Sequence, residues 1–145
     1  NRYSFAFACL GTLFMFPACI FFVGVALTPG DIFFDAHIFT TTTAFNLYTV
    51  SIFFYVIAFI SSSLSNYYTS GAILLLIAVS VYSYYLSGYQ PIDAIKDREL
   101  YLEVYTMDLL IFNVVLQKVI ISLMIITIIT FSFGLNKLIN KKETR

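Results

Sequence analysis

A lysine stands inside a long apolar stretch of this chain of 145 residues. Lys118 directly follows Gln117 in the last apolar run, and Asn113 lies four residues before Gln117, on the same face of a helix. A charged side chain within a membrane span is costly, so by default it indicates a functional site. Together with Asn46 in an earlier run, these side chains form the predicted polar lining of a transport or binding path.

Two structural explanations compete with a functional role for Lys118. The apolar stretch 119–135 carries no charge and can span a membrane by itself, which would place Lys118 at the membrane boundary. Its ammonium group would then reach water along the flexible stem of the side chain. As a second explanation, Asp108 or Glu103 could pair with Lys118 inside the bundle. The boundary position is the favoured interpretation, the ion pair comes second, and a transport or catalytic role comes third.

The segment after the first apolar run contains two carboxylates and the single histidine of the chain. Asp31 and Asp35 are four residues apart, so a helix would place them on one face, and His37 follows closely. Carboxylates and a neutral imidazole can bind a metal ion or relay a proton. No metal-binding motif matches, and a polar cap that begins the second helix is the favoured interpretation. We therefore expect neither a metal nor a cofactor.

Small polar residues recur inside the second and third apolar runs. Asn46 and Thr49 lie three residues apart, and Ser80, Ser83 and Ser87 form a stripe at helical spacing. Such side chains usually allow membrane helices to approach closely and to hydrogen-bond each other. Helix packing is the favoured role, and a polar conduit through the bundle is the alternative.

Sequence signatures of catalysis and of nucleic-acid binding are missing. The chain has no nucleophile elbow, zinc-protease motif or phosphate-binding loop. One histidine and three methionines do not make a case for the axial ligands of a haem. The net charge is zero and no basic, aromatic surface is indicated, so we expect no nucleic-acid partner. An enzyme is therefore a less favoured class of function.

Composition and run lengths predict the elements that must position these residues. Hydrophobic residues make up 60% of the chain and charged residues 11%, whereas soluble domains have about 45–50% and about 25%. Such an excess of apolar side chains indicates a protein embedded in lipid. Four runs come close to the roughly 20 residues that cross a bilayer as a helix. They cover residues 3–27, 44–60, 67–88 and 109–135.

These runs predict an all-α fold, an antiparallel bundle of four transmembrane helices in a single domain over residues 1–145. Strands are usually about 4–8 residues long, so the runs are too long for strands, and they lack the alternation of a membrane barrel. Pro17 should kink the first helix. The stretch 91–104, in which Pro91 precedes several acidic residues, predicts a short helix at the membrane surface.

Basic residues lie mainly near the two ends of the chain. Arg2 and four basic residues within 137–145 share one side of a four-span bundle, whereas Lys96 and Arg98 lie on the other side. This asymmetry predicts that both termini are cytoplasmic. Because the first residue is Asn rather than Met, we expect a processed chain or a piece of a longer one. The first apolar run is interpreted as a retained span, since it is too long for a typical signal peptide.

Two short motifs resemble a group of multi-span membrane proteins. The segment Gly24–Asp31, which reads Gly-Val-Ala-Leu-Thr-Pro-Gly-Asp, precedes His37, and Gln117 and Lys118 open the last span. This pattern resembles the DUF998 and Frag1/DRAM-like families, which typically have about six spans. The resemblance implies that the chain covers the last four spans and that it carries no catalytic residues at identifiable positions. Family members are mostly of unknown function, and some relatives act in lipid or membrane-trafficking processes.

Three functions are consistent with the sequence. The favoured one is a non-enzymatic structural, assembly or regulatory membrane subunit that packs against itself or a larger complex. The second is a small transporter or channel component that uses the polar lining around Lys118. The third, a lipid-modifying membrane enzyme, would have its site near His37. Membrane lipids are expected partners in every case.

Overall fold

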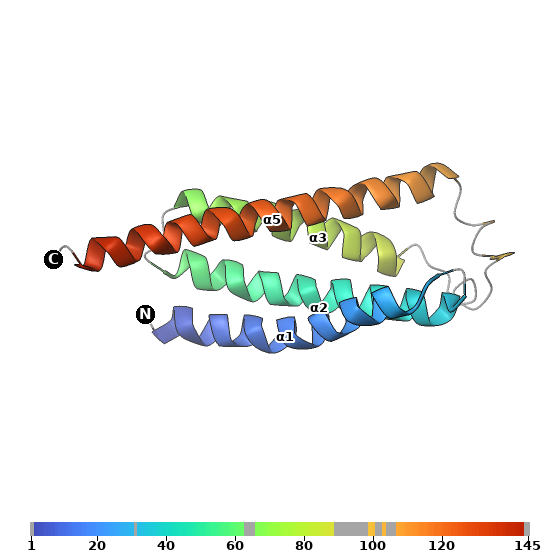
Figure 1. The fold of residues 1–145 in the computed structure, drawn as a ribbon, viewed down its shortest axis with the longest axis horizontal. Coiled ribbons are helices and arrows are strands. Elements are labelled where there is room, and N and C mark those ends of the chain that lie inside the picture. The colour runs from blue at the N-terminus through green and yellow to red at the C-terminus, as the bar shows by residue number, and fades with distance from the viewer. Residues whose placement is uncertain are drawn as a thin grey trace.

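The structure, a computed structural model, describes residues 2–30, 32–62, 66–88, 99–100, 103 and 107–143. Within these ranges the chain forms four long helices and no strand (Figure 1). They are α1 (Arg2–Leu27), α2 (Phe34–Ile60), α3 (Asn66–Gly88) and α5 (Met107–Glu143). All four are long and apolar enough to cross a membrane. The predicted all-α membrane bundle is therefore confirmed, and the chain is an integral membrane protein.

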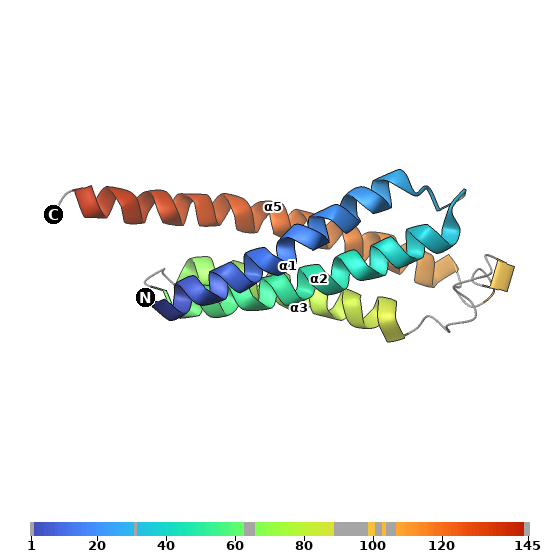
Figure 2. The same cartoon turned by 90° about the horizontal axis from the view of Figure 1, so that it is seen from below.

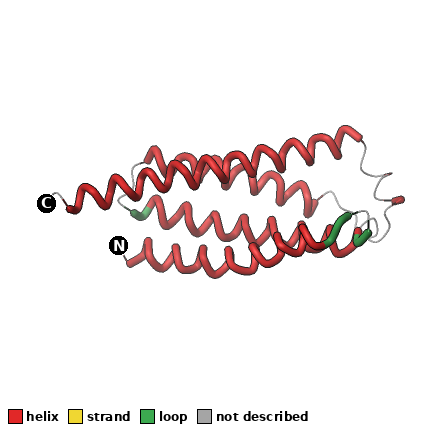
Figure 3. Tube along the Cα trace, in the orientation of Figure 1, coloured by secondary structure: helices red, strands yellow, loops and turns green. Residues whose placement is uncertain are grey.

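The four helices run alternately up and down along one long axis (Figure 3). α1 begins and α5 ends at the same end of the bundle, which we call the terminal end (Figure 1). The turn between α1 and α2 lies at the opposite end, which we call the loop end. This arrangement places both ends of the described chain on one side of a membrane, as an even number of crossings requires.

α2 begins at Phe34, ten residues before the start expected at residue 44. The threonines at 40–43 appear too polar for a membrane helix. Thr40, however, donates a hydrogen bond from Oγ1 to the carbonyl of Ala36 over 2.7 Å. A threonine that bonds to its own helix in this way needs no water, so the helix tolerates it. His37 consequently lies within the first turns of α2 rather than in a loop.

For the other three helices, most of the observed first and last residues lie within two residues of the predicted ones. α1 continues as one helix through Pro17, and α3 matches the expected range within a residue. α5 extends past residue 135 to Glu143, since the segment 136–143 contains neither Gly nor Pro and remains compatible with a helix. The surface helix expected over 91–104 falls largely outside the described residues.

Small residues of α1 allow it to lie closely against α2. A Cβ atom placed on Gly11 would come within 3.0 Å of the Tyr55 ring, so only glycine fits there without a shift. Ser51 donates a hydrogen bond to the Gly11 carbonyl over 2.7 Å, and Ser4 donates one to the Ala58 carbonyl over 2.8 Å. Close approach at small residues, reinforced by hydrogen bonds, is how membrane helices associate when lipid removes the hydrophobic driving force.

The contact between α3 and α5 follows the same principle. A Cβ atom on Gly134 would lie 3.0 Å from the ring of Tyr68, near the terminal end. About two turns before Gly134 on α5, Thr127 donates a hydrogen bond from Oγ1 to the carbonyl of Gly71 over 3.4 Å. Gly134 therefore permits the ring of Tyr68 to approach the backbone of α5 directly, whereas Gly71 contributes a carbonyl acceptor.

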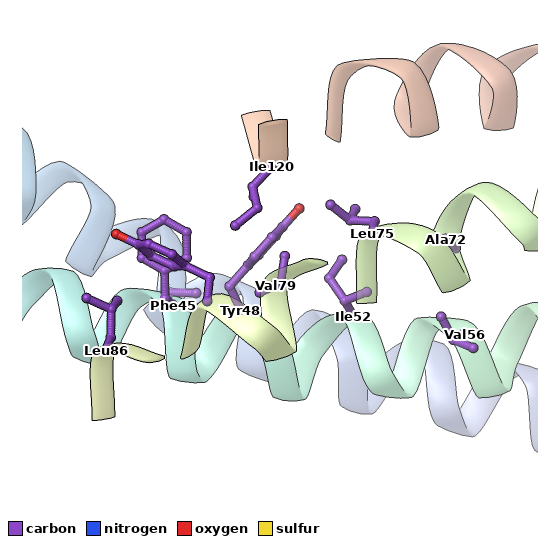
Figure 4. Close-up of a cluster of buried hydrophobic side chains, with 11 residues drawn as sticks. Phe45, Tyr48, Ile52, Val56, Ala72, Leu75, Val79, Leu86 and Ile120 are labelled. Carbon is purple, nitrogen blue, oxygen red and sulfur yellow. The ribbon is translucent and has the colours of Figure 1, made fainter. Parts of the chain in front are cut away.

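The buried core lies chiefly between α2 and α3 (Figure 4). Its centre contains Tyr82, which is 0% exposed and whose ring meets that of Phe45 at a centroid distance of 4.4 Å. Edge-to-face aromatic pairs of this kind contribute about 0.5–1.5 kcal/mol beyond the buried area. Ile120 contributes to this cluster from α5, and Ala18 contributes from α1.

The four helices form an open row rather than a closed bundle. α1 packs closely on α2, α2 on α3, and α3 on α5, whereas α1 and α5 are not a closely packed pair in the described part of the chain. Figure 2 shows the two outer helices diverging from each other over part of their length. The buried residues of α1 are only Gly11 and Ala18. Among the described side chains of α5, only Ile120 and Gly134 are buried.

Candidate functional site

Two places in the described structure could carry a function. One is a cluster of polar side chains shared by α2, α3 and α5, which we call the polar cluster. Its members are Asn46, Thr49, Tyr82, Ser83 and Gln117. The other is an apolar groove lined by all four helices, which we call the apolar groove.

The first half of the polar cluster joins α2 to α3. Ser83, a buried residue of α3, donates a hydrogen bond from Oγ to Asn46 Oδ1 over 2.7 Å. The same hydroxyl accepts a hydrogen bond from Thr49 Oγ1 over 3.2 Å. One serine therefore connects two residues that stand one turn apart on α2. This result agrees with the interpretation of these residues as helix-packing contacts.

The second half of the polar cluster joins α3 to α5. Gln117 donates a hydrogen bond from Nε2 to the hydroxyl of Tyr82, which is fully buried. Tyr82 and Ser83 are consecutive, and consecutive helical residues point about 100° apart. Their polar groups therefore bond to different neighbours, the Tyr82 hydroxyl to α5 and the Ser83 hydroxyl to α2, although the Tyr82 ring also packs on Phe45 of α2. In surroundings that exclude water, such bonds are strong because the alternative is an unpaired polar group.

Three buried polar atoms have no hydrogen-bond partner within the described part of the chain: Asn113 Oδ1 on α5 and the Oγ1 atoms of Thr41 and Thr42 on α2. Asn113 Oδ1 is buried one turn before Gln117 on α5. Thr41 Oγ1 on α2 is also buried, and its residue is only 6% exposed. An unpaired buried acceptor or hydroxyl costs about 1–3 kcal/mol. Of the predicted lining residues, Asn113 is therefore the one whose side chain is best placed to accept a polar ligand.

Lys118 is exposed and does not join the polar cluster. It follows Gln117 by one residue, so it points about 100° away from the face that contacts Tyr82. Helical side chains lean toward the N-terminus of their helix, which for α5 is the loop end. Lys118 is about 17 Å from Met107 but about 24 Å from Gly134, so it leans toward the nearer end of the span. This position favours a snorkelling lysine.

The predicted alternative, an ion pair of Lys118 with Asp108 or Glu103 inside the bundle, does not agree with the positions of these side chains. All three side chains, including that of Lys118, are exposed. Asp108 also stands ten residues from Lys118 on the same continuous helix, about 15 Å along its axis. That separation is several times the reach of a salt bridge.

His37 stabilises the turn between α1 and α2. Its ring Nδ1 lies 2.6 Å from the carbonyl oxygen of Thr28, so Nδ1 carries the proton and donates it. Asp35 is exposed and stands two residues from His37, a spacing that does not put two side chains on one helical face. Asp31 lies outside the described residues. Within the described ranges, no group of three His, Cys, Asp or Glu side chains is placed to hold a metal ion.

Two threonines complete this turn: Thr28, which belongs to the Gly24–Asp31 motif, and Thr40, which no sequence motif indicated. Thr28 donates a hydrogen bond from Oγ1 to the Gly24 carbonyl over 2.8 Å, and its hydroxyl lies 3.3 Å from that of Thr40. The Thr40 side chain also touches the α carbon region of Gly24, where a Cβ atom would come within 3.0 Å. The four-residue spacing of Gly24 and Thr28 is the sequence feature that is compatible with the bond from the Thr28 hydroxyl to the Gly24 carbonyl. The residues of the first resemblance motif thus form one hairpin contact.

The apolar groove has a volume of about 350 Å³. Its lining comes from α1 (Met15), α2 (Tyr48, Ile52, Tyr55, Phe59), α3 (Ala72, Leu75) and α5 (Met124, Thr127, Ile128, Phe131). The groove is partly open and almost wholly apolar, so it suits hydrocarbon and not water. No sequence pattern could reveal it, since the same residue types also line a core and face lipid.

The rings of Phe59 and Phe131 line the part of the groove nearest the terminal end. They stack with centroids 4.6 Å apart and join α2 to α5. Tyr55 stacks on Phe59 at 6.1 Å, and its hydroxyl lies 2.9 Å from Thr12 Oγ1 on α1. The polar tip of Tyr55 is therefore engaged away from the groove, which keeps the groove apolar.

These two places must be interpreted from their own geometry. No family model matches the chain, and neither a curated protein nor a solved structure is found to be similar to it.

Proposed function

We propose that this chain is a non-enzymatic membrane subunit with a structural, assembly or regulatory role. It would pack against other transmembrane helices, either of a second copy or of a larger complex. The open row of helices is the observation that supports this proposal, because α1 and α5 each have one close helical neighbour in the described structure. Lateral faces of both outer helices are thereby left for a partner.

The paired state of most polar side chains supports a non-enzymatic role. A membrane enzyme or a transporter needs polar groups that are available to a substrate. Here Ser83 and Gln117 hydrogen-bond to neighbouring helices, and His37 bonds to the end of α1. These bonds stabilise the contacts between helices and the turn between α1 and α2.

The exposed face of α1 offers a direct way to test the subunit role. Cys9 and Cys19 are both exposed free cysteines on this helix, and large apolar residues such as Phe16 and Val23 are exposed with them. In native membranes, a bifunctional thiol reagent should cross-link α1 to a partner helix. The chain should also copurify in a fixed ratio with another membrane polypeptide, or with itself, in mild detergent.

The controls are Cys9→Ser, Cys19→Ser and the double variant. Each single variant should lose only those cross-links that need the missing thiol, and the double variant should lose all of them. A chain that stays monomeric in lipid nanodiscs, copurifies with nothing and gives no cross-link would overturn the proposal.

A small transporter or channel component is the second candidate. It is favoured by the unpaired buried atoms Asn113 Oδ1 and Thr41 Oγ1, which could contact a polar solute. In proteoliposomes, this function predicts that Asn113→Leu abolishes flux while the protein remains folded. Flux that persists in Asn113→Leu, or no flux in the unaltered protein, would count against this candidate.

The orientation and the family resemblance remain part of the proposal. A cytoplasmic terminal end is supported by Arg2 and by the basic residues of 137–145. The resemblance to the DUF998 and Frag1/DRAM-like families remains a prediction, and it fits a chain of several spans without an identifiable reactive site. Labelling of a cysteine added after Arg145 from either side of the membrane tests the orientation.

A further inference from the structure

We propose that the apolar groove holds an acyl chain of one anionic phospholipid, whose phosphate headgroup lies at the basic terminal end of the bundle. This site is separate from the outer faces of α1 and α5 that the subunit role would use. The two proposals can therefore fail independently.

The size of the groove fits part of an acyl chain. Its volume of about 350 Å³ is within the usual range for small-molecule sites, about 300–1,000 Å³. Because the groove is partly open, a slender hydrocarbon chain can enter it from the surrounding lipid.

The walls of the groove suit flexible hydrocarbon. Met15 of α1 and Met124 of α5 lie on its lining, and methionine side chains adapt their shape to an irregular guest. Aromatic rings from α2 and α5 provide flat apolar surfaces. The lining offers no charged side chain, so nothing in it would bind a headgroup.

The groove reaches the level at which a lipid headgroup would lie. Phe59 stands one residue before the end of α2 at Ile60, so this part of the groove is near the terminal end. Tyr48 lies about 17 Å deeper along the same helix. The groove thus runs from near the membrane surface toward the middle of the bundle, along the direction that a lipid tail takes.

Charge favours an anionic headgroup at this end. α5 continues beyond the groove residue Phe131, and its last turns include Lys137, Lys141 and Lys142. These positions lie about 9–17 Å past Phe131, and α5 extends beyond the other helices there (Figure 1). Arg2 is exposed at the same end. Basic residues just outside a membrane span attract anionic lipids.

The opposite end of the same helices has the opposite charge. The first turn of α5 contains Asp108, and the first turn of α2 contains Asp35. An anionic headgroup at the loop end would meet these carboxylates, whereas the terminal end has the exposed Arg2 and three lysine positions along the last turns of α5. The charge distribution therefore places the headgroup at the terminal end of the groove.

The test uses the full chain, reconstituted in nanodiscs of phosphatidylcholine with phosphatidylglycerol and then transferred to mild detergent for native mass spectrometry. The expected result is one retained phosphatidylglycerol molecule per chain, in preference to phosphatidylcholine. Retention of both lipids in proportion to their supply, or of neither, would overturn the proposal.

Two variants on neighbouring residues of α5 test the groove itself. Ile128 lines the groove and is 59% exposed, whereas Ile129 is 51% exposed and does not line it. Ile128→Trp should fill the groove and remove the lipid adduct, and Ile129→Trp should keep it. Equal lipid retention by these two variants would overturn the proposal. Loss of a dimer, rather than of a lipid, in Ile128→Trp would also overturn it, because a second copy would then be the occupant.

Charge variants test the headgroup without touching the packed helices. Combined Lys137→Gln, Lys141→Gln and Lys142→Gln should abolish the preference for phosphatidylglycerol over phosphatidylcholine. Lys118→Gln, which removes one charge toward the loop end, should leave that preference unchanged. An unchanged preference in the triple variant would overturn the headgroup assignment. The cross-linking at Cys9 and Cys19 should persist in all these variants, which separates this result from the subunit role.

Discussion

Ser83 of α3 donates a hydrogen bond to Asn46 of α2 over 2.7 Å, and it does so next to Tyr82, which accepts one from Gln117 of α5. Two consecutive residues therefore link α3 to both of its neighbours, α2 and α5. The polar residues that first suggested a conduit act here as contacts between helices. This distinction can be tested by measurements of stability.

Loss of the Ser83 hydroxyl should destabilise the bundle. Ser83→Ala removes the bonds to both Asn46 and Thr49, and interhelical bonds in membranes contribute about 0.6–1.7 kcal/mol. Thermal unfolding in detergent should show this loss. Ser122→Ala is the control, since that exposed hydroxyl bonds only to its own helix, at the carbonyl of Lys118. Equal stability of the two variants would contradict the predicted role of Ser83.

Gln117 and Lys118 should respond differently to the same substitution. Gln117→Leu leaves the buried Tyr82 hydroxyl without the bond from α5, at a cost of about 1–3 kcal/mol. Lys118→Leu, at an exposed position, should change stability by no more than about 0.5 kcal/mol. Unfolding of both variants in the same detergent measures the difference. A large loss for Lys118→Leu would instead indicate a partner inside the bundle.

Two glycines provide a matched test of helix approach. Gly11→Ala introduces a Cβ atom 3.0 Å from the ring of Tyr55, so α1 or the ring must shift, at a cost of about 1–3 kcal/mol. At Gly71 the nearest atom is Thr127 Oγ1 at 3.7 Å, which is an ordinary contact. Gly71→Ala should therefore be neutral, or stabilising by up to about 1 kcal/mol through helix propensity. The reverse order of stabilities would contradict the packing described for α1 and α2.

His37→Ala should loosen the turn between α1 and α2 without unfolding the bundle. The substitution removes the bond to the Thr28 carbonyl, which contributes about 1 kcal/mol. Amide hydrogen exchange should rise in the segment 28–37 and remain unchanged in α3. Asp35→Asn, at an exposed position two residues away, is the control. Unchanged exchange in His37→Ala would show that this hydrogen bond does not hold the turn.

Run length and composition predicted the class of fold and most of the helix positions. α1 and α3 match the expected ranges closely, because a charge-free stretch of this length leaves its backbone few ways to be satisfied in lipid other than as a helix. The start of α2 could not be placed in this way. Composition counts threonine as polar, whereas within α2 the Thr40 hydroxyl is satisfied by the Ala36 carbonyl of its own helix.

Among the candidate polar residues, Gln117 and Asn46 contact other helices, whereas Lys118 is exposed. A spacing of one residue changes the direction of a side chain by about 100°, and the sequence does not state which direction faces a neighbour. Tyr82, which accepts a bond from α5, was not among the candidates, because a tyrosine near the end of an apolar run is equally consistent with a ring at the membrane–water interface.

What the amino-acid sequence determined by itself is that four stretches of this chain lie in lipid as helices, since their peptide groups must bond internally wherever water is absent. The tertiary structure decided which faces of those helices meet. Gly11 against Tyr55 fixes how α1 approaches α2, and Gly134 against Tyr68 does so for α5 and α3. The apolar groove follows from these approaches, because lipid tails solvate every apolar face alike and only the close fit of particular side chains distinguishes one face from another.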